Sequence, residues 1–187
     1  MGDGYFCVTS INKMTPQSWL ISSTLLYFLI NGAQLFETFV VVPKWTASPP
    51  GSFRLLRDRN GLDLKTFWIL FHSIHETLFI LAIVFCWRLG PVGRQLLGLF
   101  ILHMGVRMWT IVYFAPAIIK FQKMVGDETS NTAAAATANP ATANPAAASP
   151  AAATANLPAK TRQWRNYNYL RVGIYILISL LQALLCL

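Results

Sequence analysis

"FWILFHSIHETLFILAIVFCW" (residues 67–87) decides the fold class of this chain. The stretch is long enough to cross a hydrocarbon core of about 30 Å as a single helix, and most of its side chains are apolar. The ionisable residues within it are His72, His75 and Glu76. Because ionisable groups are costly to insert into a membrane, their presence indicates a functional site or specific polar partners.

Three further apolar stretches have a similar length, at roughly 19–42, 96–119 and 167–187. The 187 residues are 55% hydrophobic and only 12% charged, which is too few polar residues to cover a soluble domain. In hydrocarbon the backbone must satisfy its own hydrogen bonds, so long apolar stretches form helices. The sequence therefore predicts an all-α membrane protein, a bundle of four transmembrane helices.

The predicted organisation is one bundle with a linker inserted before its last helix. We expect residues 1–126 to hold helices one to three, 127–160 to form a flexible linker, and 161–187 to form helix four. The stretch "TANPATANPAAASPAAATANLP" (137–158) has small residues and recurring prolines, so it cannot bury enough apolar surface to fold. In the first loop, "SFRLLRDRN" (52–60) predicts a short amphipathic helix at the headgroups. The short "RLGPVGR" (88–94) makes helices two and three antiparallel neighbours.

The basic residues are distributed unequally between the two ends of the predicted bundle. The net charge is +8. The side with both termini carries Lys13, Arg88 and Arg94. The opposite side carries Lys44, Arg54, Arg57, Arg59, Lys65, Lys120, Lys123, Lys160, Arg162 and Arg165. The positive-inside rule then places loops 43–65 and 120–166 in the cytoplasm and both termini on the other side. We expect these residues to contact membrane lipids and not nucleic acid, because no soluble domain remains to present a nucleic-acid surface.

Each predicted helix carries its polar residues at helical spacing, on one face. A helix rises about 1.5 Å per residue, so His75 and Glu76 lie about 15 Å deep, close to the midplane. Four such faces are satisfied together only if they turn inward, which predicts a polar cavity more open towards the basic side. The faces are Thr24, Tyr27, Asn31, Gln34 and Glu37; His72, His75 and Glu76; His103 and Arg107; and Asn168, Arg171, Tyr175, Ser179 and Gln182.

A purely structural interpretation of these residues stays open. Glu37 and Glu76 balance Arg107 and Arg171, so ion pairs could serve to fix helix register. However, inserting one charge costs at least ~2.5–3.5 kcal/mol. A polar contact between membrane helices returns only about 0.6–2 kcal/mol. The number of polar groups therefore favours a functional cavity.

The histidines raise the question of a metal. His72 and Glu76 are four residues apart and can face one ion, with His75 or His103 completing a two-histidine, one-carboxylate set for a non-haem metal. The nearby arginines would repel a cation, so we expect no cofactor and treat the metal as the alternative. Haem ligation by His75 and His103 is a further alternative. The scattered Cys7, Cys86 and Cys186 predict neither disulfide nor thiolate site.

Two stretches carry a resemblance to a known family. "NGAQLFETFVVVP" (31–43) has a glycine midway along the first helix and a proline at its exit, and "WRNYNYLR" (164–171) leads into the last helix. With four spans, the chain resembles the anthrone-oxygenase-like family of small membrane proteins. The resemblance implies a four-helix bundle and, in the members with an assigned role, oxygen insertion into a reduced polycyclic phenol without an evident cofactor. It places Asn168 and Arg171 in the family's polar pocket.

We predict an intramembrane site that binds or oxidises an apolar small molecule, as a cofactor-independent or metal-assisted oxygenase or oxidoreductase. A histidine would take a proton and an arginine would stabilise the anion. The alternatives are an accessory or assembly subunit of a larger membrane complex, or a homo-oligomer, and transport of protons or solutes. The expected catalytic residues are His72, His75, Glu76 and Arg107, and the expected substrate-binding residues are Asn31, Gln34, Glu37, His103, Asn168, Arg171 and Tyr175.

Overall fold

The computed structural model of the chain describes residues 15–56, 64–124 and 156–187. Within these ranges the chain is helical and contains no β-strand, as the sequence predicts. The elements are α1 (Pro16–Phe36), the π-helix η1 (Glu37–Val41), α2 (Val42–Trp45), the 3₁₀ helix η2 (Gly51–Leu56), α3 (Leu64–Cys86), the 3₁₀ helix η3 (Trp87–Leu89), α4 (Pro91–Trp109), the π-helix η4 (Thr110–Phe114) and α7 (Leu157–Leu184).

Four continuous helices are long and apolar enough to cross a membrane. They are Pro16–Trp45, Lys65–Leu89, Pro91–Met124 and Leu157–Leu184, of 30, 25, 34 and 28 residues. A span needs about 20 residues, so the longest helices run past the hydrocarbon core. The chain is thus a multi-pass integral membrane protein with the predicted four-helix bundle.

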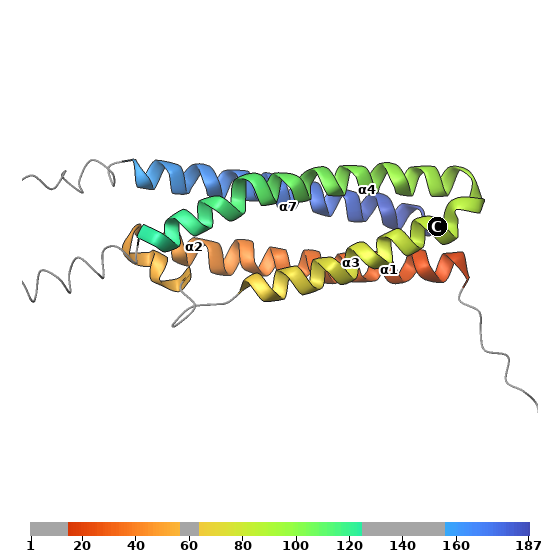
Figure 1. The fold of residues 1–187 in the computed structure, drawn as a ribbon, viewed down its shortest axis with the longest axis horizontal. Coiled ribbons are helices and arrows are strands. Elements are labelled where there is room, and N and C mark those ends of the chain that lie inside the picture. The colour runs from red at the N-terminus through yellow and green to blue at the C-terminus, as the bar shows by residue number, and fades with distance from the viewer. Residues whose placement is uncertain (1–14, 57–63, 125–155) are drawn as a thin grey trace, which may run out of the picture.

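The helices adjoin in the cyclic order α1, α3, α4, α7, so α1 faces α4 across the bundle. Figure 1 shows α1 beside α3 along one side and α4 beside α7 along the other. The start of α1 and the C-terminus lie at one end, together with η3; α2, η2 and the start of α7 lie at the opposite end (Figure 1).

Two glycines set the turn between α3 and α4. Gly90 has φ 63°, a left-handed conformation that glycine adopts without strain. A Cβ on Gly93 would lie 2.8 Å from the Cα of Trp87, so only glycine allows this close approach. The predicted tight, antiparallel connection of spans two and three is confirmed.

Helix α7 begins earlier than predicted, at Leu157 rather than at residue 161. Leu157 is buried in the bundle, and Pro158 lies in the first helical turn, where its missing N–H removes no helix hydrogen bond. The prediction counted this proline as a helix breaker, which is why it placed the boundary too late. The rest of the predicted linker, 127–155, lies outside the described residues.

An aromatic cluster closes the end of the bundle opposite the C-terminus. Phe53 of η2 is fully buried and stacks on Phe121, with ring centroids 4.8 Å apart. Trp45 and Trp164 meet edge-to-face at 4.8 Å beside them. The predicted amphipathic segment is thus a short 3₁₀ helix packed onto the bundle by Phe53, with Arg54 exposed. Its residues 57–60 lie outside the described part of the chain.

Candidate functional site

All four predicted polar faces turn into the bundle, as expected from their spacing. The charged members Glu37, Glu76, Arg107 and Arg171 are partly buried. Large apolar side chains dominate the outer surface, which suits lipid. The fully buried members of the faces are Thr24, Tyr27, Asn31, Gln34, His72, His75, His103, Asn168, Tyr175, Ser179 and Gln182.

Five of these side chains form one cluster of rings in the middle of the bundle. The ring of Tyr27 in α1 has its centroid 4.2 Å from His75, 5.3 Å from His103 and 6.4 Å from Tyr175. His72 joins the cluster at 6.3 Å from Tyr175. The cluster therefore brings together side chains of all four spanning helices.

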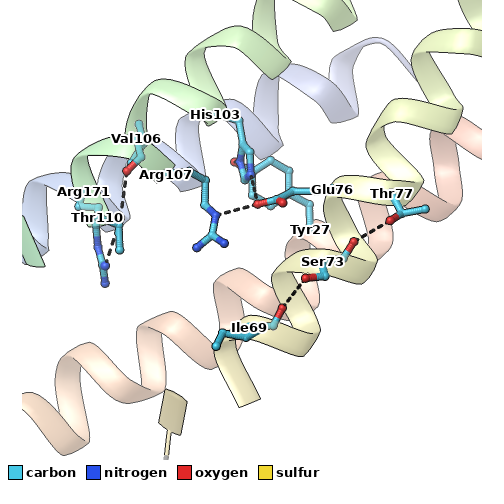
Figure 2. Close-up of polar contacts among 10 residues, drawn as sticks. All are labelled: Tyr27, Ile69, Ser73, Glu76, Thr77, His103, Val106, Arg107, Thr110 and Arg171. Atoms are coloured by element: carbon cyan, nitrogen blue, oxygen red, sulfur yellow. Dashed lines mark hydrogen bonds and ion pairs between the residues drawn. The ribbon is translucent and has the colours of Figure 1, made fainter. Parts of the chain in front are cut away.

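His103 is oriented by Tyr27. The Tyr27 hydroxyl and Nδ1 of His103 lie 2.8 Å apart and share a hydrogen bond across the bundle. This bond leaves Nε2 of His103 directed at Glu76, whose Oε1 is 3.9 Å away. Figure 2 shows Tyr27 and His103 beside the Glu76 carboxylate. His75 and His103 are in edge contact, with ring centroids 5.1 Å apart.

Glu76 and Arg107 form an ion pair between α3 and α4. Nε of Arg107 donates to Oε1 of Glu76 at 2.7 Å, as the dashed line in Figure 2 marks. Their side chains are 26% and 21% exposed, so the pair reaches the surface of the bundle halfway along α3. A polar group so placed is within reach of a molecule dissolved in the lipid.

Arg171 is held by hydrogen bonds and not by the carboxylate of Glu37. Its Nη2 donates to Oδ1 of Asn168 at 2.7 Å, its Nη1 lies 3.5 Å from Oγ1 of Thr110, and its guanidinium lies 4.6 Å above the Phe114 ring. Within the described residues no ion pair at 4.0 Å or less involves Arg171. The two arginines therefore differ: Arg107 is paired with a carboxylate and Arg171 is part of a hydrogen-bonded network.

The interface of α1 and α7 is joined by amide and hydroxyl groups. Nδ2 of Asn31 donates to Oγ of Ser179 at 2.8 Å, and Nε2 of Gln182 donates to Oγ of Ser23 at 3.0 Å. Such contacts hold membrane helices together. The contacts thus account for the amide nitrogens of Asn31 and Gln182, while the amide oxygens of both residues have no hydrogen-bond partner among the described residues. The predicted substrate-binding role of Asn31 stays a prediction.

The centre of the bundle contains polar atoms without partners. Both ring nitrogens of His75, Nδ1 of His72, Nε2 of His103 and the Tyr175 hydroxyl are buried and lack a hydrogen-bond partner among the described residues. Single unpaired atoms also occur elsewhere in the described bundle, on Asn31, Gln34, Trp164, Arg165, Arg171 and Gln182. An unpaired buried polar group costs about 1–3 kcal/mol. Nearly all such groups in folded proteins are paired, so unpaired ones gathered at one place call for a functional explanation.

Three side chains on α3 and α4 have the residue types and the spacing of metal ligands. One ligand atom each of His72, Glu76 and His103 lies within 4.8 Å of the other two. The sequence left His75 and His103 as equal candidates for the third ligand, and the structure brings His103 to the other two.

An apolar groove of about 450 Å³ opens between α1 and α3. Trp68 lines it and also contacts His72, with ring centroids 5.5 Å apart. Trp68 therefore borders both the groove and the ring cluster, and the groove offers space for an apolar body. Its other lining residues are Phe28, Leu29, Ile30, Gly32, Ala33, Phe67 and Phe71.

Sequence reasoning missed three residues of the site. Tyr27 was placed on the polar face of the first span but not in the site, although its ring contacts His75, His103 and Tyr175. Thr38 and Thr110 were not singled out, yet their hydroxyls accept from Asn168 at 3.1 Å and from Arg171 at 3.5 Å. Thr110 follows Arg107 by three residues, and this spacing was a usable signal.

Fold and site define a four-span membrane protein with a buried cluster of histidine and tyrosine rings beside an intramembrane ion pair. Searches among known protein families, curated proteins and solved structures found no match to the chain.

Proposed function

We propose that the protein binds an apolar small molecule that carries one ionisable polar group, such as a phenol or an enolisable carbonyl. The main support for this proposal is the buried His75, whose two ring nitrogens have no hydrogen-bond partner among the described residues. The unpartnered Tyr175 hydroxyl belongs to the same ring cluster. A hydroxyl or carbonyl of the bound molecule would satisfy these groups, and its apolar body would lie in the groove next to Trp68.

The same arrangement supports proton transfer. A histidine accepts a proton from a phenol or from a carbon next to a carbonyl, and a guanidinium stabilises the anion that forms. His75 supplies the first group and Arg107 the second, while the apolar surroundings strengthen the electrostatic attraction. The resemblance to anthrone oxygenases extends the proposal to oxidation of that anion, with molecular oxygen as the oxidant.

We also propose the orientation that the basic residues predict. The end of the bundle with α2 and η2 faces the cytoplasm, and the end with η3 and the C-terminus faces the opposite side. The exposed Lys44, Arg54 and Lys160 lie on the basic side and suit anionic headgroups.

The experiment is to extract the protein from native membranes in polymer nanodiscs and to identify co-purified small molecules by mass spectrometry. The wild type should retain an apolar molecule with a hydroxyl or carbonyl group in addition to lipids. His75→Phe keeps a flat ring of similar size but removes both nitrogens, so retention of that molecule should fall about tenfold or more, as for the loss of hydrogen bonds to a buried polar group.

The matched control is Ser73→Ala, on the lipid-facing side of the same helix, where the hydroxyl bonds only its own helix backbone at Ile69. It should retain the molecule as the wild type does. Equal retention by the wild type and His75→Phe would contradict the proposal.

A further inference from the structure

We infer that His72, Glu76 and His103 form a binding site for one divalent transition-metal ion of the zinc and iron(II) class. The three ligand atoms lie within 4.8 Å of one another, on two helices that also share the Glu76–Arg107 ion pair. This inference uses a different set of side chains from His75 and Tyr175, which carry the proposed ligand site, and it holds whether or not a small molecule binds there.

The donor set selects the class of metal. Imidazole nitrogen and carboxylate oxygen suit zinc and iron(II), whereas magnesium and calcium prefer oxygen ligands alone. With bonds of about 2.1 Å, ligand atoms around zinc lie roughly 3.4 Å apart. The three atoms lie within 4.8 Å of one another, so the site requires His72 and Glu76 to move by about 1 Å towards the fixed His103 ring. Three protein ligands leave a coordination position open, the arrangement found in catalytic metal sites.

Metal-binding histidines usually form a hydrogen bond through the ring nitrogen that does not bind the metal, and His103 has a partner for such a bond. Its Nδ1 shares a 2.8 Å hydrogen bond with the Tyr27 hydroxyl. In the tautomer that donates this bond, Nε2 carries a lone pair, and this buried nitrogen has no hydrogen-bond partner among the described residues. Nε2 is also the atom that lies 3.9 Å from Glu76. The ring is thus fixed with its free nitrogen towards the carboxylate.

Arg107 shapes the site through the carboxylate. Its Nε donates one hydrogen bond to Oε1 of Glu76, the oxygen 3.9 Å from Nε2 of His103, so the ion would bind Oε2 or the remaining lone pair of Oε1. The guanidinium also repels a bare cation. The complete site therefore favours a metal that carries an anionic fourth ligand, such as hydroxide or a phenolate, because that charge compensates the arginine.

The test is a titration of tag-free, ligand-free protein in synthetic-lipid nanodiscs with Co²⁺, a coloured substitute for zinc, followed by competition with Zn²⁺. The wild type should bind about one equivalent, with the absorption of a low-symmetry cobalt site, and zinc should displace it. Glu76→Gln and His103→Gln should each weaken binding about 100-fold, while Ser73→Ala should bind as the wild type does.

Tyr27→Phe keeps the ring and removes the hydroxyl, so it serves where a ligand substitution prevents folding. It should weaken Co²⁺ binding about tenfold with the stoichiometry unchanged. Failure of the wild type to bind one equivalent would overturn the inference, as would variants at Glu76 and His103 that bind like the wild type. The titration contains no small molecule, so its outcome is independent of the ligand-retention experiment.

Discussion

Glu76 and Arg107 show how charged side chains are retained halfway across the bundle. Their 2.7 Å contact compensates both charges, and partial exposure leaves the remaining N–H groups of the guanidinium accessible from the α3–α4 side. Removing one partner leaves an uncompensated charge in an apolar environment, whereas removing both leaves none. The two substitutions should therefore be strongly coupled.

We predict that Glu76→Gln and Arg107→Gln each lower the free energy of unfolding by about 1–3 kcal/mol, and that the double variant loses less than their sum by about 1–2 kcal/mol. The free energy of unfolding is measured for the wild type, the two single variants and the double variant in mixed micelles, by titration with a denaturing detergent. Strictly additive losses would show that the pair is not formed in the membrane protein.

At the scale of elements, both π-helices are followed by a proline at the same spacing. In η1 and η4 the π-helix begins six residues before a proline, at Glu37 before Pro43 and at Thr110 before Pro116. The proline lacks the N–H that would bond four residues earlier, at a position inside each π-helix, and its ring crowds that turn. A widened turn is a usual response to such a conflict.

Both π-helices supply a threonine to α7. Thr38 of η1 accepts a hydrogen bond from Asn168, and Thr110 of η4 lies within hydrogen-bond distance of Arg171. Asn168 and Arg171 are bonded to each other at 2.7 Å. The widened turns thus tie both long helices to the polar face of α7.

A π-helix contains one residue more than a regular helix, so deleting one residue there keeps both flanking faces in place. We predict that deletion of Ile111, an exposed residue of η4, preserves the fold but lowers its thermal stability, because Pro116 then conflicts with a regular helical turn. Ile101 is equally apolar and exposed but lies in the regular part of α4. Its deletion rotates the helix after position 101 by about 100° relative to the helix before it, which should unfold the bundle. Thermal unfolding of both proteins in detergent decides this; equal effects would contradict the role given to η4.

At the scale of the whole molecule, the fold class was predictable because hydrophobic length and polar spacing are local properties of the sequence. Spans, inward polar faces and the antiparallel turn at Gly90 all follow from them. The start of α7 was misjudged because Pro158 acts differently in a first turn than within a helix. The relative positions of the histidine side chains were not predictable from the sequence. They depend on how α1 and α4 pack across the bundle and bring Tyr27 to His103.

The polar interior divides into two kinds of contact. Between α1 and α7 the amide nitrogens of Asn31 and Gln182 donate to serine hydroxyls and hold the helices together, although the amide oxygens of both residues are unpaired among the described residues. Around His75 the ring nitrogens and the Tyr175 hydroxyl are buried without partners. A protein that needed only a stable bundle would gain from an apolar side chain at position 75, because replacing an unpaired polar group by an apolar one of similar shape is neutral or stabilising.

The measurement that tests this account most directly is the thermal unfolding midpoint of ligand-free His75→Phe in synthetic-lipid nanodiscs. The account predicts a midpoint equal to or above that of the wild type. The control Asn31→Leu breaks the hydrogen bond to Ser179, so it should lose about 1 kcal/mol of unfolding free energy and unfold at a lower temperature. A midpoint for His75→Phe as low as that of Asn31→Leu would show that His75 serves the fold and would contradict the proposed ligand site.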